Sequence, residues 1–270
     1  TPPLPHWAAS ARVTGPLAGF DVAATLQGEA RAGRAAPQAS ASAHVTPFAA
    51  LPVSAVQVRT TELDLRALSD RAPATRLQGE LRLATTRPAA LDVDLRNLAP
   101  AAWSDGGLPV ASLVAHLEAP WSGEFIAIPA LRLALADAKG SGGELRGHSR
   151  WEAGKAQVQV DLDQVQPARL DARLGAWRIA GPLRAEIDHL PAPASLWGGG
   201  AAAAPASAAA PAATLDGWSA HVTGRLAGSA PPPGPASHAV VPPPMALQLD
   251  AQLRADALQL KQFELKAGAA

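Results

Sequence analysis

The chain has 270 residues, with 23 lysines and arginines against 23 aspartates and glutamates, and it contains no cysteine. This balance lacks the basic excess of nucleic-acid-binding proteins, and the absence of thiols excludes disulfides and thiolate metal sites. Apolar residues make up 48% of the chain, but many are alanines and only 4% of residues are aromatic, so Leu and Val must supply most of the hydrophobic surface.

The first strong pattern is an alternation of apolar and charged residues in two runs within residues 75–100, separated by a proline turn. Successive side chains of a strand point to opposite faces, so each run predicts a strand with one apolar and one charged face. A helix would scatter both sets around its axis. The apolar positions are Leu77, Leu81 and Leu83 in the first run and Leu91, Val93 and Leu95 in the second.

The same alternation returns further along the chain, and residues 75–100, 128–165 and 245–267 contain its clearest copies. Weaker copies occur at 55–65, 112–119, 181–190 and 218–228. Copies recur about every 12 to 16 residues, a spacing typical of strands joined by short turns, and no helical segments of the kind a βαβ fold needs lie between them. We therefore predict an all-β protein with one elongated antiparallel sheet. The later apolar positions are Leu131, Leu133, Leu135, Val158, Val160, Leu162, Leu247, Leu249 and Leu253.

Two local features modify the strands. The apolar positions change from even to odd numbers between Leu260 and Phe263, which predicts a bulge or turn near Lys261 and Gln262. A glycine also recurs just inside the strand pattern, where it indicates a bend or a close approach of two backbones. These glycines are Gly28, Gly79, Gly147, Gly181 and Gly224.

Low-complexity segments interrupt the pattern at 198–214 and 228–244, and residues 36–52 are interpreted as a third, shorter interruption. The predicted organisation is a β-repeat segment over 1–190, a continuation with two Pro- and Ala-rich loops over 191–244, and a further β-repeat over 245–270. No run of about 18 uncharged apolar residues appears. Both ends look cut, which suggests a piece of a longer protein.

A search for catalytic and metal-binding patterns gives only weak candidates. The histidines at 6, 44, 116, 148, 189, 221 and 238 are scattered without metal-ligand spacing. The segment 147–151 has Trp151 where a nucleophile elbow needs glycine, and 139–147 lacks the ending of a phosphate loop. The pairs Asp92/Asp94 and Asp161/Asp163 suit either calcium or a solvated strand face, and we favour the solvated face. We predict no enzyme, no cofactor and no metal site.

The segments "LQGEL" (77–81), "LDVDLRNLAP" (91–100) and "LPVASLVAHLEA" (108–119), with the stretch 129–171, resemble the periplasmic repeats of the TamB and wider AsmA-like family. TamB is the inner-membrane subunit of the translocation and assembly module. The resemblance covers most of the chain outside the two loops. It implies a β-taco, which is a long sheet curled into a hydrophobic trough, and a periplasmic location with an inner-membrane anchor outside these residues.

The resemblance also implies a function. The family is implicated in moving phospholipids between the inner and outer membranes and in outer-membrane protein assembly, with an outer-membrane barrel partner. The fifteen apolar positions named above would then line the lipid groove, while the interleaved charges face solvent. A structural β-repeat, such as the passenger of an adhesin, is the alternative, although solenoid adhesins are rich in asparagine and Asn97 is the only one here. A closed β-sandwich or barrel with a small ligand is the third possibility.

Overall fold

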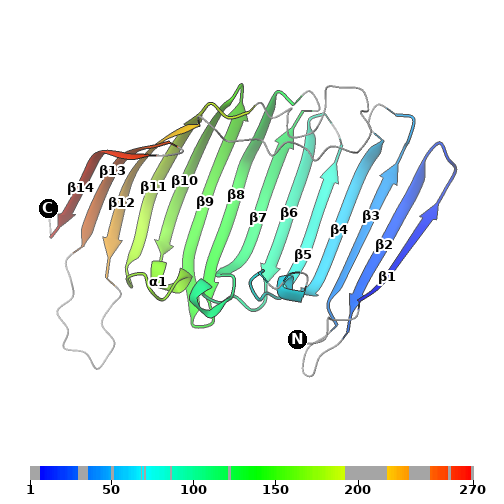
Figure 1. Ribbon diagram of the computed structural model, residues 1–270, viewed down its shortest axis with the longest axis horizontal. Coiled ribbons are helices and arrows are strands. Elements are labelled where there is room, and N and C mark those ends of the chain that lie inside the picture. The colour runs from blue at the N-terminus through cyan, green and yellow to red at the C-terminus, as the bar shows by residue number, and fades with distance from the viewer. Residues whose placement is uncertain are drawn as a thin grey trace.

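The computed structural model describes residues 7–29, 36–49, 52–67, 69, 71–85, 87–120, 123–191, 218–230, 244–254 and 257–268. In these residues the chain forms fourteen antiparallel strands that lie side by side, in sequence order, in one open sheet (Figure 1). The all-β prediction and the antiparallel sheet are therefore confirmed. The strands are β1 (Trp7–Thr14), β2 (Phe20–Gly28), β3 (Gln38–Val45), β4 (Val53–Leu63), β5 (Leu77–Ala84), β6 (Ala89–Asn97), β7 (Val110–Ala119), β8 (Phe125–Asp137), β9 (Gly140–Glu152), β10 (Lys155–Val165), β11 (Arg178–Asp188), β12 (Ser219–Ser229), β13 (Met245–Arg254) and β14 (Leu258–Ala267).

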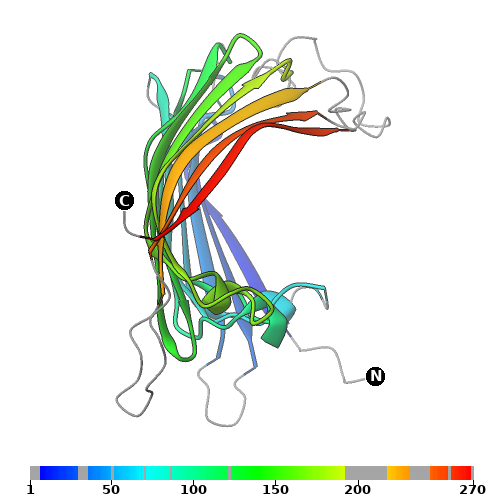
Figure 2. The same ribbon diagram turned by 90° about the vertical axis from the view of Figure 1, so that its left-hand side faces the viewer.

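The sheet is a single layer. The extensive contacts between elements join sheet neighbours, and the helix α1 (Pro167–Leu170) adds contacts with β8 and β9. The strands curve toward one side along their length, and the short helical segments lie at one end of the strands on that side (Figure 2). Across the strands, thirteen spacings of about 4.8 Å make the sheet roughly 60 Å wide.

Residues 36–52 are not an interruption, and that interpretation was wrong, because Gln38–Val45 forms β3. Its pattern of Ala39, Ala41 and Ala43 alternating with Ser40 and Ser42 has period two, but the side chains are too small to make the alternation conspicuous. The strands β1 and β2 lie within the β-repeat predicted for 1–190, and Gly28, predicted just inside the strand pattern, is the last residue of β2. Strand pairing with larger neighbours decides the conformation of these segments.

The sheet also continues through the region between the two low-complexity segments. Strand β12 pairs with β11 on one side and with β13 on the other, so residues from all three predicted segments belong to one sheet. β12 extends to Ser229, past the predicted start of a loop at 228. The predicted loop at 198–214 lies outside the described residues, as does most of the one at 228–244.

The bulge predicted near Lys261 is confirmed. On β14, Gln262 pairs with Asp250 and Leu260 pairs with Ala251, so Lys261 is the extra residue in the ladder. This extra residue keeps Leu260 and Phe263 on the same face, although one has an even and the other an odd residue number.

The structural role of the strand glycines is clearest at Gly79 and Gly181. Gly79 has a φ of +150°, and a Cβ atom built on it would lie 2.0 Å from the carbonyl oxygen of Asp94 on β6. Gly181 has a φ of +132°, and its Cβ would lie 2.2 Å from the carbonyl oxygen of Arg225 on β12. Both positions combine a backbone conformation that favours glycine with a close approach of the next strand.

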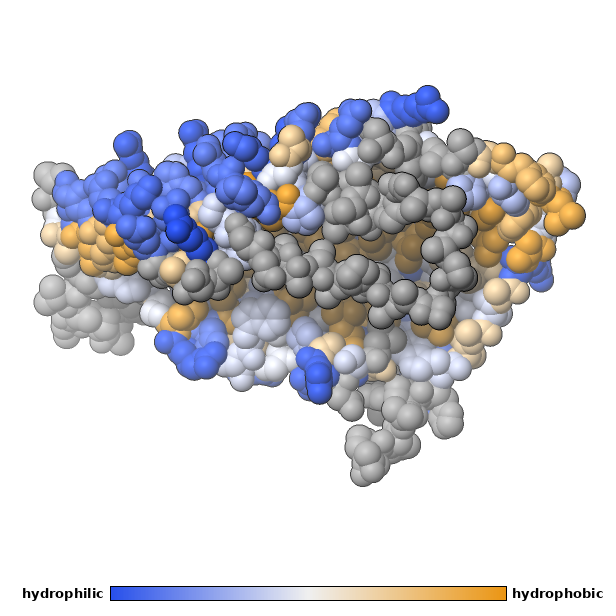
Figure 3. All heavy atoms as spheres, turned by 45° about the horizontal axis from the view of Figure 1, so that its top comes forward, coloured by the Kyte–Doolittle hydropathy of each residue, from blue (hydrophilic) through white to orange (hydrophobic). Residues whose placement is uncertain are grey.

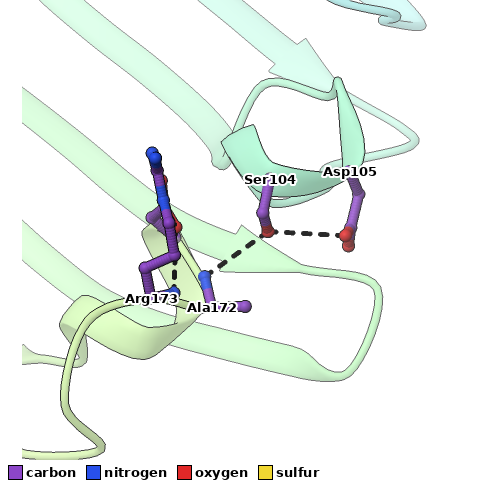
Figure 4. A network of polar contacts seen from close by, with 5 residues as sticks. Ser104, Asp105, Ala172 and Arg173 are labelled. Carbon is purple, nitrogen blue, oxygen red and sulfur yellow. Dashed lines mark hydrogen bonds and ion pairs between the residues drawn. The ribbon is translucent and has the colours of Figure 1, made fainter.

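Three longer loops meet at one end of the strands and form what we call the loop strip. They are β4–β5, with the helical turn η1 (Leu65–Ala67); β6–β7, with η2 (Trp103–Asp105); and β10–β11, with α1. Arg66 Nη2 donates to the Gly106 carbonyl at 2.9 Å, which ties the first loop to the second. The Ala172 amide donates to Ser104 Oγ at 3.4 Å, which ties the second loop to the third (Figure 4).

Well-buried polar residues gather at the loop strip: Thr75 and Asp171 lie in its loops, and Asn97 lies at the end of β6 that joins it. Asn97, at the end of β6, is 6% exposed, and its Oδ1 accepts from the amides of Arg76 and Ala99 while its Nδ2 donates to the Leu108 carbonyl. Pro109, which follows Leu108 in the chain, is fully buried. Hydrogen bonds therefore hold this end of the sheet where an ordinary domain would use a second layer.

Candidate functional site: the apolar face of the sheet

Cross-strand pairing gathers apolar residues on one face of the sheet, here called the apolar face, and its central row is continuous. The central row takes one residue from each strand, and each member pairs directly with the next. No member of this row is polar or charged. The row is Ala11, Ala24, Ala41, Val58, Leu81, Val93, Ala115, Leu131, Gly147, Val160, Leu183, Gly224, Leu249 and Phe263.

The fifteen residues predicted to line a groove all lie on this face, on strands β5, β6, β8, β10 and β13. The pairs Leu81–Val93 and Leu83–Leu91 are direct neighbours on β5 and β6. Leu133 and Leu162 both pair with Leu145 of β9, so β9 connects the predicted residues of β8 and β10. Register therefore gathers five separate runs of sequence into one surface.

Other residues of the apolar face were not singled out from the sequence. They lie on strands whose alternation is weaker. Their cross-strand partners, rather than the local sequence pattern, show that they belong to the apolar face. Val56 pairs with Leu83, and Leu113 pairs with both Leu95 and Leu133. The further members include Leu26, Val58, Leu145, Leu183, Leu226 and Phe263.

The large side chains of this face are only partly buried. Among the described residues, the well-buried apolar side chains are mostly alanines, and the larger ones are Pro109, Leu135 at 6% and Val165 at 7% exposed. Leu135 lies beside α1, where a Cβ atom on Gly142 would touch both Leu135 and Arg169. The leucines and valines of β5 and β6 keep intermediate exposure, because no second layer in the described chain covers them.

Apolar residues gather inside the hollow of the molecule, while charged residues lie along the outer surface above it (Figure 3). This distribution follows from the alternation of the strands, because the curvature turns one set of side chains toward the hollow and the other set away from it. The hollow side can take apolar ligands, and it offers them few hydrogen-bond partners.

The opposite, polar face has carboxylates held by arginines. Glu80 accepts from Arg82 Nε and Nη2, both at 2.8 Å, and from Gln57, and Arg59 Nε lies 3.3 Å away. These hydrogen bonds, first that of Arg82, lower the pKa of Glu80 to about 2. The charges stabilise one another across strands, as they do on a solvated sheet face.

Glu144, further along the polar face, has the same environment. It lies between Arg132 and Arg146, and the hydrogen bond from Arg146 is the main reason why its pKa is lowered to about 2. The arrangement leaves both carboxylates ionised and paired, which does not suit a general acid.

Four of the histidines, at 44, 116, 148 and 221, and the paired aspartates also lie on this face. His116 Nδ1 lies 2.6 Å from Asp92 Oδ1, and this hydrogen bond raises the pKa of His116. His44 pairs in the same way with Asp21 at 2.7 Å. Asp94, Asp161 and Asp163 point away from the apolar face and form no cluster. The described residues contain no group of three or more His, Asp or Glu side chains placed to hold a metal ion.

Comparison with known proteins identifies no relative: no family model, no curated protein and no solved structure matches the chain. Within the described residues, no helix is long and apolar enough to span a membrane.

Proposed function

We propose that the apolar face is a lipid groove, and that this chain is a periplasmic segment of a TamB- or AsmA-like protein that carries phospholipid acyl chains between the inner and outer membranes. The observation that supports this proposal is the central apolar row, which is unbroken across a single-layer sheet whose large side chains stay partly exposed. A structural sheet gains nothing from leaving such a surface uncovered, whereas an acyl chain would cover it.

The size of the face fits this role. A sheet roughly 60 Å wide is several times broader than one small-ligand site. Half-burial of about 14 methylene groups would contribute roughly 6 kcal/mol, at about 0.8 kcal/mol per fully buried group. Binding of this strength is compatible with exchange, which a carrier needs. The small residues of the rows, such as Ala115 and Gly147, leave room above the sheet.

The biological setting of this proposal follows the resemblance. It places the chain in the periplasm, attached through an inner-membrane segment outside these residues, with phospholipids and the outer-membrane barrel of the translocation and assembly module as partners. In that setting the sheet is a β-taco trough that supports outer-membrane biogenesis and protein secretion.

A photo-crosslinking experiment tests the groove. A photoreactive residue at Val93 or Val160 should capture phospholipid in cells that make the full-length protein, while the adjacent outward positions Asp94 and Asp161 should capture little. Equal capture from both faces, or none from either, would contradict lipid binding and would favour a purely structural β-repeat.

A charge in the apolar face supplies the functional test. Val93→Asp should obstruct lipid transport, because an unpaired charge in an apolar groove costs several kcal/mol. Asp94→Lys is the matched control on the next residue, and it should leave transport intact because it changes only the solvated face. Transport that survives Val93→Asp would argue against passage over this row.

A further inference from the structure

Two turns at the end of the strands opposite the loop strip each carry one large, exposed apolar side chain at the tip. The first joins β1 to β2, and its Gly19 amide donates to the Pro16 carbonyl at 3.0 Å. The second follows β3, and its Ala49 amide donates to the Thr46 carbonyl at 3.0 Å. Each turn carries a proline and one large apolar residue, Leu17 in the first and Phe48 in the second. Both turns lie at the upper right in Figure 1.

These two side chains are the most exposed of the large hydrophobic residues in the described chain. Leu17 is 83% exposed and Phe48 is 85% exposed. On β14, by comparison, Phe263 is 59% exposed. Full exposure of one apolar side chain is common on protein surfaces, but two on neighbouring turns form a feature that needs an explanation.

The two turns form one unit. A Cβ atom on Gly19 would lie 3.6 Å from Thr46 Cγ2 and 3.7 Å from His44 Nε2, so the base of the first turn packs against the start of the second. Neither 15–19 nor 46–49 contains a charged residue. The next turn on this edge, between β5 and β6, differs because it contains Arg87.

The geometry points to a lipid surface as the partner: we propose that Leu17 and Phe48 insert into the interface of a membrane and hold this corner of the sheet against it. Both side chains project from convex tips, whereas a protein partner would need a matching pocket for each. The tips carry no charge that could select a protein or an anionic lipid. Apolar side chains on a small uncharged surface partition into the headgroup and acyl boundary through burial alone.

This inference goes beyond the lipid groove, because it assigns a membrane contact to the described chain itself. It also gives the sheet an orientation. The corner of the sheet at the tips of β1 to β4 would lie at the lipid, and the row of strands from β5 to β14 would extend away from it. The apolar face of β1 to β3, which is lined mainly by alanines, would then begin at the membrane surface.

The chain contains no cysteine, so single cysteines can be labelled without background. The variants Leu17→Cys and Phe48→Cys, labelled with the environment-sensitive dye NBD, should show a blue shift and increased emission when phosphatidylcholine vesicles are added. Two labelled controls should show no shift: Trp103→Cys, in the loop strip, and Val114→Cys, on the polar face, where the native side chains are 52% and 46% exposed. A uniform response at all four positions, or none at 17 and 48, would overturn the proposal.

Vesicle flotation gives the second measurement. The double variant Leu17→Glu/Phe48→Glu should lose vesicle binding by about tenfold or more, since charged side chains replace both apolar side chains that would be buried in the lipid. Leu98→Glu/Leu174→Glu, at exposed positions of the loop strip, is the matched control and should bind as the wild type does. Unchanged flotation of the double variant, or binding that requires phosphatidylglycerol, would refute insertion by uncharged tips. Neither readout depends on the groove, so the two proposals can fail separately.

Discussion

Replacing Gly79 by alanine should strongly destabilise the sheet. The new Cβ atom would lie 2.0 Å from the Asp94 carbonyl oxygen and 2.9 Å from Leu95 Cα. Both atoms belong to the backbone of β6, so no rotamer change can relieve the clash. The φ of +150° also lies in a region that side-chain-bearing residues rarely adopt.

The cost has two parts. Holding an alanine at this φ costs about 1–2 kcal/mol, and forcing β5 away from β6 costs about 1–3 kcal/mol, as overpacking does in other proteins. The expected loss of unfolding free energy is therefore about 2–5 kcal/mol. Domains of this kind are stable by only about 5–15 kcal/mol, so the loss should be easy to measure.

Two other glycines separate the two contributions. Gly140→Ala introduces a side chain at a φ of +136° with no atom within 4 Å, so it should cost only the conformational part. Gly228→Ala lies within β12, where the nearest atom is 3.7 Å away and φ is ordinary, so it should be neutral or slightly stabilising.

Urea unfolding followed by tryptophan fluorescence measures all three variants. The expected order of stability is Gly228→Ala, then Gly140→Ala, then Gly79→Ala, with similar m-values. If Gly79→Ala unfolded at the same urea concentration as Gly228→Ala, the close approach of β5 and β6 would not exist in solution, and the argument for a structural glycine would fail.

Two further predictions concern the polar face and the loop strip. Because the pKa values of Glu80 and Glu144 are lowered to about 2, their contribution to stability is complete above about pH 4.5 and is lost as the pH falls toward 2. The double variant Glu80→Gln/Glu144→Gln should therefore have a flatter urea midpoint between pH 4.5 and 2 than the wild type, and parallel pH profiles would contradict the pairing. Asn97→Ala should cost about 2–3 kcal/mol in urea unfolding, because it leaves buried backbone groups of Arg76 and Leu108 without partners. Asn97→Asp keeps the acceptor oxygen for Arg76 and should cost less, and equal losses would show that this hydrogen bond contributes little.

The distribution of residues between the two faces was predictable wherever large apolar and charged residues alternate. The direction of a strand side chain is a local property of the backbone. The place of Leu81 or Val160 in the alternation along its strand is therefore enough to assign its face. The bulge at Lys261 was predictable for the same reason, since a change of parity must be absorbed by an extra residue. The alternation fails as a signal in β3, where alanine and serine differ too little in size and polarity.

The sequence by itself determined the all-β fold and the sharing of one face by the fifteen predicted residues. Only the tertiary structure decided the strand register, the assembly of the loop strip and the exposure of the turn side chains, because these features depend on groups far apart in the chain. Register between neighbouring strands placed Leu145 between Leu133 and Leu162, and hydrogen bonds between loops 68 residues apart formed the loop strip. The exposure of Leu17 and Phe48 likewise depends on where their turns lie relative to the folded sheet, which no local pattern of side chains encodes.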